Sequence, residues 1–304
     1  MKELKKNSVS FLAIGKTQES TEAVEFKKYI GLASSKVIAV NPTKQELKNI
    51  YGNSQDKEPE YVVEGENGKE ARITFIVKPD PEKYPEADIL VRAMITMRPT
   101  PAYNRDQTKV QVIDKYGNHT WADAEAAKAG GKLVSQDGKE LKINSQYRMA
   151  YVGEADLIDF LKAFLVVEDA FNYVNGTWVK KDNADKDCLF ALERIKDYFN
   201  GDFKELREAI GLQPNNKVKL LYGVRTTEEG KQYQAVATKG DLVLRNSAGS
   251  NAIAKLDTRL NDLKAQGSYP NTEFKVQELA EWSVEPTNLE AVPAGTSDGK
   301  MPWY

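Results

Sequence analysis

Side chains that catalyse reactions or bind metals are scarce in this sequence. The chain of 304 residues has one histidine, His119, and one cysteine, Cys188, so it cannot build a zinc site from Cys and His ligands. The spacing of Cys188 to Leu192 and Ile195 in DCLFALERIKDYF is typical of a buried helix face, and we interpret Cys188 as a core residue. No phosphate-binding loop, dinucleotide fingerprint or nucleophile elbow is present. The sequence predicts a protein that is not an enzyme and has no cofactor.

Carboxylates are abundant, so a Mg²⁺ site made of oxygen ligands remains an alternative. Asp156 and Asp159 in GEADLIDF are the kind of pair that could contribute to one. Their place also fits the start and the solvated face of a helix, and we predict that role and no metal site.

Aromatic and basic side chains, in contrast, gather in three segments. A protein that binds single strands needs flat π faces for bases and cations for phosphates, and each stacked base contributes about 1 to 3 kcal/mol. Aromatics also favour strands and lysines favour surfaces in any protein, so packing is the competing interpretation. The candidate nucleic-acid-binding residues are Arg98, Tyr103, Arg105, Lys109, Lys115, Tyr116, His119, Trp121, Tyr147, Arg148, Lys219, Tyr222, Arg225, Lys231 and Tyr233.

Charge is distributed unevenly along a chain whose formal net charge is -2. Residues 98–151 hold nine basic and six acidic residues, and residues 217–245 hold six and three. Residues from Glu273 onward hold six acidic residues and two lysines, which leaves the rest of the chain at +2. A basic binding face with an acidic, competing tail needs such a separation, although ordinary surfaces also cluster charge.

Capping and turn signals predict the first elements. Residues 1–42 are expected to form an N-terminal extension that includes a helix in AVEFKKYIGLAS and ends at Pro42. Thr43 as N-cap, Glu46 as its capping-box partner and Gly52 predict a short helix. Period-two patterns predict strands over 61–65, 70–78, 88–97 and 109–114, with the Asn67-Gly68 hairpin turn between the first two.

A helical block is predicted over about 153–212, because GEADLIDFLKAFLVV and two later segments have the 3.6-residue period. Strands return over 217–224 and 232–238, joined by a turn at 226–231, and AIAKLDTRLNDLKAQ predicts a C-terminal helix. This order favours an α+β fold in which residues 43–272 form an OB-type antiparallel β-barrel with an inserted helical block. Two α+β domains divided near Gly153 are the alternative.

The residues from 273 to 304 are predicted to be a disordered tail with a docking tip. Their last twenty residues are rich in Pro, Gly and Ser and bury little, so ordering them would cost roughly 1 to 2 kcal/mol per residue. The tip, Met301, Pro302, Trp303 and Tyr304, would then be free to bind a partner, unless the segment packs on the body. An acidic tether with a Pro-aromatic end resembles the C-terminus of single-stranded-DNA-binding proteins.

Several longer phrases resemble one family. NPTKQELKNIYG, EPEYVVEG, KVQVIDKYGNHTWA and YRMAYVGEADLIDFLKAFL, which span roughly Pro42 to Phe164, are similar to single-stranded-DNA-binding proteins encoded by tailed phages, including crAss-like phages. The resemblance implies an OB-fold protein that coats unwound DNA during phage replication or recombination in the cytoplasm of the infected bacterium. It also implies replication or recombination proteins as partners of the C-terminal tip. The family's T-even version has a zinc module, whose ligands this chain lacks.

Two other functions remain open at this point. A structural or cargo protein of a virion would have the same acidic pI and mixed composition, and a Mg²⁺-dependent nuclease would use carboxylates. No apolar run approaches the roughly 20 residues that a membrane helix needs, so we expect no membrane partner.

Overall fold

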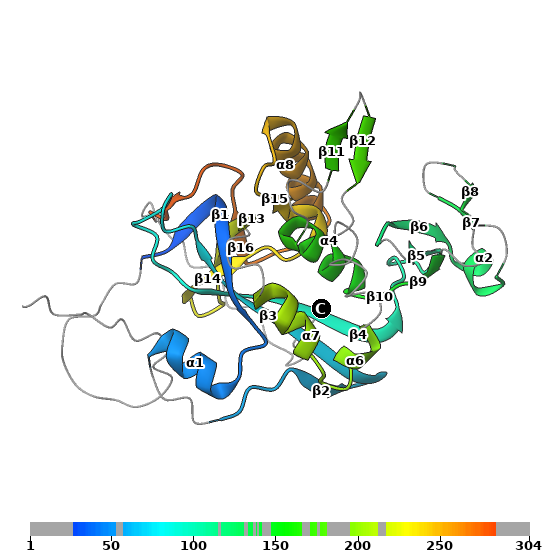
Figure 1. Cartoon of the computed structure of the whole chain (residues 1–304), viewed down its shortest axis with the longest axis horizontal. Helices are drawn as coiled ribbons and strands as arrows, with labels where there is room; N and C mark the ends of the chain where they lie inside the picture. Colours follow the sequence, from blue (N-terminus) through cyan, green and yellow to red (C-terminus); the bar gives the residue numbers. More distant parts are fainter. Residues whose placement is uncertain are drawn as a thin grey trace, which may run out of the picture.

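A computed structural model describes residues 27–52, 57–114, 117–130, 133–135, 138, 140–141, 147–165, 171–174, 177–180, 195–211 and 217–283. These residues form a mixed α+β protein that is dominated by antiparallel sheets. The main sheet has the strand order β10-β4-β3-β1-β13-β14 (Figure 1). Its strands are β1 (Tyr29–Val40), β3 (Gly68–Pro79), β4 (Val91–Pro101), β10 (Tyr151–Val152), β13 (Lys217–Thr226) and β14 (Gln232–Val236).

Short strands extend this sheet. β2 (Val62–Gly65) pairs with β3, β15 (Leu244–Arg245) and β16 (Thr272–Phe274) pair with β13, and β17 (Ala280–Glu281) pairs with β1. Gly65 lies opposite Gly68, so the Asn67-Gly68 signal correctly marked a hairpin turn. The predicted turn between β13 and β14 is also confirmed.

The main sheet curls until its strand β14 lies beside β4. The hydroxyl of Thr238, just after β14, donates to the carbonyl oxygen of Met94 in β4 at 3.3 Å. Within the described ranges no hydrogen-bonded ladder joins β4 to β14, so the sheet is not a closed barrel.

Alternating side chains divide the main sheet into an inner and an outer face. The inner face carries the largest core, where Phe75 of β3 stacks on Phe160 with ring centroids 4.2 Å apart. Helices α4 (Glu154–Leu165), α6 (Ile195–Tyr198) and α7 (Lys204–Gly211) pack into this core. The outer face is covered by α8 (Ser250–Ala265) at Leu32 and Leu221, and by α1 (Lys44–Tyr51) at Ile76. On the outer face of β4, Arg92 and Met94 are exposed.

A smaller sheet follows β4 and lies at the far end of the molecule in Figure 1. Its strand order is β6-β5-β9, formed by β5 (Lys109–Asp114), β6 (His119–Asp123) and β9 (Tyr147–Met149). The helix α2 (Ala124–Lys128) and the hairpin β7 (Leu133–Val134) with β8 (Glu140–Leu141) add a separate small core, centred on Val110 and Val112. A 3₁₀ turn, η1 (Gly240–Leu242), follows β14.

The predicted helix at residues 44–51 is confirmed together with its cap. The Thr43 side chain accepts a hydrogen bond from the Glu46 amide while the Glu46 carboxylate accepts one from the Thr43 amide at 2.7 Å. The predicted helical block at 153–212 is only partly helical, because the hairpin β11 (Phe171–Val174) with β12 (Thr177–Lys180) lies between α4 and α6. The predicted C-terminal helix is α8.

The prediction for residues 1–42 is wrong in one respect. The segment AVEFKKYIGLAS was expected to be helical, but β1 begins at Tyr29 and is a central strand that pairs with β3 and β13. Residues 29–35 are all buried, since both faces of this strand are covered. A short, continuously apolar run does not distinguish a buried strand from a buried helix, which explains the error.

The prediction that the tail starts at Glu273 is wrong, because the residues that follow Glu273 pack on the body. Phe274 is 1 % exposed in β16, the Leu32 amide donates to the Gln277 carbonyl at 2.6 Å, and the Trp282 amide donates to the Lys28 carbonyl at 2.7 Å. Residues 272–283 therefore pack on the body, and residues 284–304 lie outside the described part. This later segment holds three acidic residues and one lysine, which leaves residues 1–283 with no net charge. A competing tail formed by residues 284–304 would therefore have a net charge of -2 in place of the -4 counted from Glu273.

Candidate nucleic-acid interface

The candidate residues predicted from the sequence do not form one site. Lys115, Tyr116 and the tip Met301, Pro302, Trp303 and Tyr304 lie outside the described residues. Of the remaining candidates, one group lies on the small β6-β5-β9 sheet and another lies at the turn between β13 and β14.

The group on the small sheet is only partly exposed. Arg105 is exposed on the loop that leads into β5, Lys109 is exposed at the start of β5, and Trp121 is half-buried opposite Gln111. The Lys128 ammonium lies 5.4 Å from the ring centroid of Tyr103. Tyr147 packs against the small core, and its burial raises the pKa of its hydroxyl. These residues surround the small sheet and do not line one groove.

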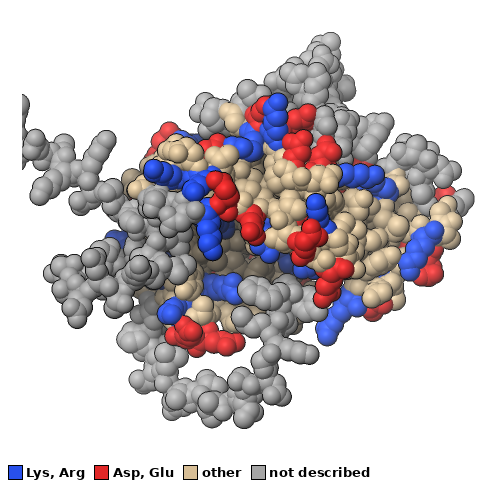
Figure 2. All heavy atoms as spheres, turned by 90° about the horizontal axis from the view of Figure 1, so that it is seen from below, with Lys and Arg blue, Asp and Glu red and all other residues tan. Residues whose placement is uncertain are grey.

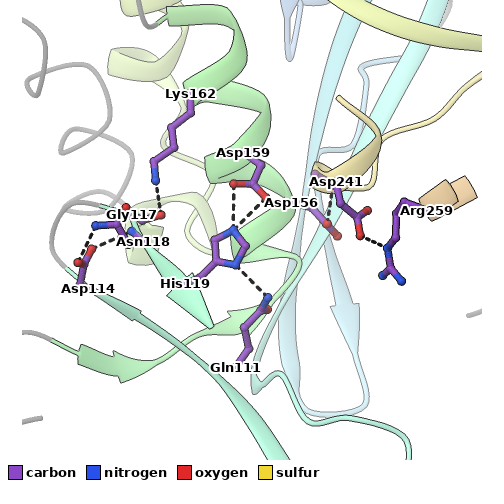
Figure 3. Close-up of polar contacts among 11 residues, drawn as sticks. Gln111, Asp114, Gly117, Asn118, His119, Asp156, Asp159, Lys162, Asp241 and Arg259 are labelled. Atoms are coloured by element: carbon purple, nitrogen blue, oxygen red, sulfur yellow. Dashed lines mark hydrogen bonds and ion pairs between the residues drawn. The ribbon is translucent and has the colours of Figure 1, made fainter. Parts of the chain in front are cut away.

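The imidazole ring of His119 is held by a carboxylate of helix α4. Its Nε2 lies 2.9 Å from both carboxylate oxygens of Asp159 on α4, and its Nδ1 lies 3.5 Å from the Gln111 amide (Figure 3). The Lys162 ammonium, one turn further along α4, donates to the Gly117 carbonyl. These contacts attach the β5-β6 hairpin to α4, so the geometry gives His119 a structural role.

The same face of α4 also holds the chain that follows β14, since Gly240 lies beside both Asp156 and Asp159. The Asp156 carboxylate accepts a hydrogen bond from the Gly240 amide at 2.9 Å. Burial raises the pKa of this carboxyl, and the Gly240 hydrogen bond offsets only part of that effect. Helix α4 thus contacts both the small sheet and the segment that closes onto β4.

Several predicted cations are committed to partners. Arg98 pairs with Glu70 at 2.9 Å, Arg148 Nη1 donates to the buried Glu154 carboxylate at 2.9 Å, and Lys231 pairs with Glu229 at 2.8 Å. The Lys219 ammonium donates to the Ala248 carbonyl. A cation that already has an acceptor gains less from a phosphate, because the existing contact must first be broken.

Tyr222 requires a correction. The sequence placed it among residues that stack on bases, but its side chain is fully buried in the core beneath the main sheet. Its hydroxyl lies 2.9 Å from the Ser35 hydroxyl, and burial raises the pKa of the phenol strongly. In β13, Tyr222 packs into the inner core and its neighbour Leu221 packs under α8, so Arg225, which has the parity of Leu221, points outward.

The structure forms a groove that combines aromatic and basic side chains, on the outer face where β14 approaches β4. The groove has a volume of about 500 Å³. Met94 of β4 is 49 % exposed there and Tyr233 of β14 is 53 % exposed, and they are two of the four large apolar side chains that are strongly exposed among the described residues. Its lining residues are Arg92, Met94, Arg225, Thr227, Tyr233, Gln234, Ala235, Val236 and Thr238.

Two arginines of this groove are not neutralised by a neighbour. No carboxylate within the described ranges lies at ion-pair distance from Arg92 or Arg225. The Arg92 guanidinium lies 5.5 Å from the ring centroid of Tyr51, which holds it over α1. Figure 2 shows Lys and Arg side chains interspersed with Asp and Glu on one face of the molecule, so the described residues form no continuous basic patch on that face.

Sequence reasoning found Arg225 and Tyr233 but missed Arg92 and Met94. The signal was the alternation in VRAMITMR: the odd positions from Val91 to Met97 are buried, whereas Arg92 and Met94 are exposed. The predicted strand over 88–97 was correct, and its polar face simply contains fewer aromatic residues than the segments that were selected.

Comparisons of the chain with protein-family models, with curated proteins and with solved structures found no match. None of the helices in the described part of the chain is long and apolar enough to span a membrane. The described residues also contain no group of three or more His, Cys, Asp or Glu side chains placed to hold a metal ion.

Proposed function

We propose that this protein binds single-stranded DNA without sequence preference, through the groove between β4 and β14. The observation that carries the proposal is the groove itself. Two exposed apolar side chains, Met94 and Tyr233, line it together with Arg92 and Arg225, whose guanidinium groups have no carboxylate partner in the described part of the chain. Exposed apolar surface costs free energy in water, so its presence beside cations favours a ligand with flat rings and negative charge.

The sheet topology supports an OB-type fold as part of this proposal. β1, β3 and β4 form a three-stranded meander, a connection that contains α4 follows, and the β13-β14 hairpin returns to lie between β1 and β4. An OB-fold is a partly open five-stranded barrel that binds oligonucleotides on its second and third strands and on the loop between its last two. In this chain those elements are β3, β4 and the turn between Thr226 and Gln232. Of these, β4 lines the groove with Arg92 and Met94, and the turn lines it with Thr227.

The mechanism combines stacking with phosphate neutralisation. Tyr233 presents a ring for a base, Met94 supplies a polarizable apolar surface, and the two arginines meet the backbone phosphates. None of these contacts reads a base edge, so we expect little sequence preference. The role in phage replication or recombination, with partners at the tip from Met301 to Tyr304, remains part of the proposal on the resemblance of the sequence alone.

A titration tests the proposal directly. Fluorescein-labelled oligo-dT of 20 nucleotides and a duplex of equal length are titrated with the full chain, and binding is followed by fluorescence anisotropy at 50 and 200 mM salt. We expect the single strand to bind more tightly than the duplex and its affinity to fall steeply with salt. Equal affinity for the two, or no saturable binding at 50 mM salt, would rule the function out.

A further inference from the structure

The small β6-β5-β9 sheet carries a second set of unpaired cations beside an aromatic ring. Lys109 lies at the start of β5 and Arg105 on the loop before it, and both side chains are exposed. In the described part of the chain, no carboxylate lies at ion-pair distance from either cation. Trp121 of β6 lies directly opposite Gln111, so it is diagonal to Lys109 on the same face of the sheet.

This face of the small sheet is the one that meets helix α4. The register places His119 on the same face as Trp121, two residues away in β6. The small core around Val110 and Val112 lies on the opposite face. Because the His119 ring contacts the Asp159 carboxylate (Figure 3), the face that carries Trp121 is turned toward α4.

The segment that follows β14 reaches the same part of α4. Thr238 lines the groove between β4 and β14, and Gly240 lies two residues further on. A Cβ on Gly240 would lie 2.6 Å from the Cβ of Asp159, the residue whose carboxylate contacts His119. Lys239, between Thr238 and Gly240, is exposed and has no ion-pair partner within the described ranges. In Figure 1, α4 lies between β14 and the small sheet, so this segment joins the two areas.

Carboxylates between the two areas are engaged, whereas the cations are not. Asp159 is paired with His119, and Asp241 is paired with Arg259. The Asp123 carboxylate caps helix α2 by accepting a hydrogen bond from a backbone amide. The three cations named above have no such partner among the described residues, so they are available to phosphates.

We propose that one DNA strand contacts the protein in two areas, the groove between β4 and β14 and the Trp121 face of the small sheet, and passes Lys239 between them. On the small sheet a base stacks on Trp121, and the phosphates meet Lys109 and Arg105. The inference rests on the proposed function and adds a dependence on strand length, because only a strand that reaches both areas gains from the second contact.

The first test compares two strand lengths. Fluorescein-labelled oligo-dT of 6 and of 20 nucleotides is titrated with the full chain and followed by anisotropy at 50 mM salt. Trp121→Ala should weaken binding of the 20-mer roughly fivefold or more, the lower end of what one stacked base contributes, and should reduce the gain of the 20-mer over the 6-mer. A 20-mer also offers more positions for a single contact, and that part of the gain remains in the variant. Trp121→Phe keeps a ring and should bind within about twofold of the parent.

A second variant tests the cations independently of the ring. Arg105→Ala/Lys109→Ala should make the dependence of log K on log salt concentration shallower by about 1.4 for the 20-mer, since each phosphate contact on a single strand contributes about 0.7. Lys204→Ala/Lys255→Ala is the matched control, because it removes two exposed lysines, on α7 and α8, and should leave the slope unchanged. All variants are compared only after thermal melts match the parent.

The outcomes separate this inference from the proposed function. If the parent does not bind the 20-mer, the function fails and the second contact fails with it. If Tyr233→Ala weakens binding while Trp121→Ala or Arg105→Ala/Lys109→Ala behaves like the parent, the function stands and the second contact is refuted. The second contact is also refuted if the lysine control lowers the slope as much as Arg105→Ala/Lys109→Ala. Should Trp121→Ala fail to fold, the double variant at exposed positions decides alone.

Discussion

Tyr233 of β14 lies directly opposite Arg225 of β13 in the ladder of the β13-β14 hairpin. Side chains that face each other in this way have Cβ atoms about 5 Å apart. Both point to the outer face, where Tyr233 is 53 % exposed. If a base stacks on the Tyr233 ring, the phosphate of the same nucleotide lies within reach of the Arg225 guanidinium. The hairpin would then contact both the base and the phosphate of one nucleotide.

The ring of Tyr233 is the first target for mutation. Tyr233→Ala should weaken oligo-dT binding by about 1 to 3 kcal/mol, the range measured for one stacked base. Tyr233→Phe keeps the ring and should bind like the parent. Anisotropy titrations at fixed salt measure both variants. Val134→Ala removes another strongly exposed apolar side chain, on β7, and serves as the control. A normal affinity of Tyr233→Ala would show that this ring does not stack on a base.

The two free arginines make a prediction about salt. Each phosphate neutralised on a single strand contributes a slope of about -0.7 to the dependence of log K on log salt concentration. Arg92→Ala/Arg225→Ala should therefore make the slope shallower by roughly 1.4 and weaken binding most at low salt. Titrations at four salt concentrations measure it. Arg259→Ala on α8, whose side chain is paired with Asp241, should not change the slope. A parallel downward shift without a change of slope would contradict the assignment.

The sequence predicted those parts of the fold that depend on neighbours along the chain. The capping box of Thr43 and Glu46 and the turn at Asn67-Gly68 are local signals, and the structure has both. β1 and β16 depend instead on residues far away in the chain. Tyr29 of β1 pairs with a residue more than two hundred positions away, and Phe274 of β16 pairs with one about fifty positions away. Local patterns do not contain that information.

The candidate site shows the same limit. Counting aromatic and basic residues selected Tyr222 and Tyr233 equally, yet the first is in the core and the second is on the outer face. Only the registers of β13 with β1 and of β13 with β14 determine which face each residue occupies. Likewise Arg98 and Arg92 are equivalent in sequence terms, and the position of Glu70 distinguishes them.

Gly153, between β10 and α4, should be essential for stability. Its φ is +80°, and a Cβ at this position would lie 2.2 Å from the carbonyl oxygen of Thr96 in β4. Gly153→Ala combines an unfavourable backbone conformation with a clash against backbone, so we expect a loss of at least about 2 kcal/mol of unfolding free energy in urea denaturation. Gly211→Ala, where nothing lies within 4 Å and φ is not positive, should cost little. Similar losses for both variants would refute this explanation.

The raised pKa of Asp156 predicts the direction in which the stability of the fold changes with pH. Burial raises the pKa of its carboxyl above the ordinary 3.8, so the folded chain binds this proton more tightly than the unfolded chain does. The contribution of Asp156 to stability is therefore favourable at low pH and is lost as the pH rises from about 3.8 through the raised pKa.

Asp156→Asn removes this charge and keeps an oxygen that can accept from the Gly240 amide. We expect the variant to be more stable than the parent at pH 7, with the difference shrinking toward pH 4, in urea denaturation across that range. Asp257→Asn, an exposed position on α8, should change stability by less than about 0.5 kcal/mol at either pH. If Asp156→Asn is instead less stable at pH 7, the charged carboxylate strengthens the contact with Gly240 by more than its burial costs.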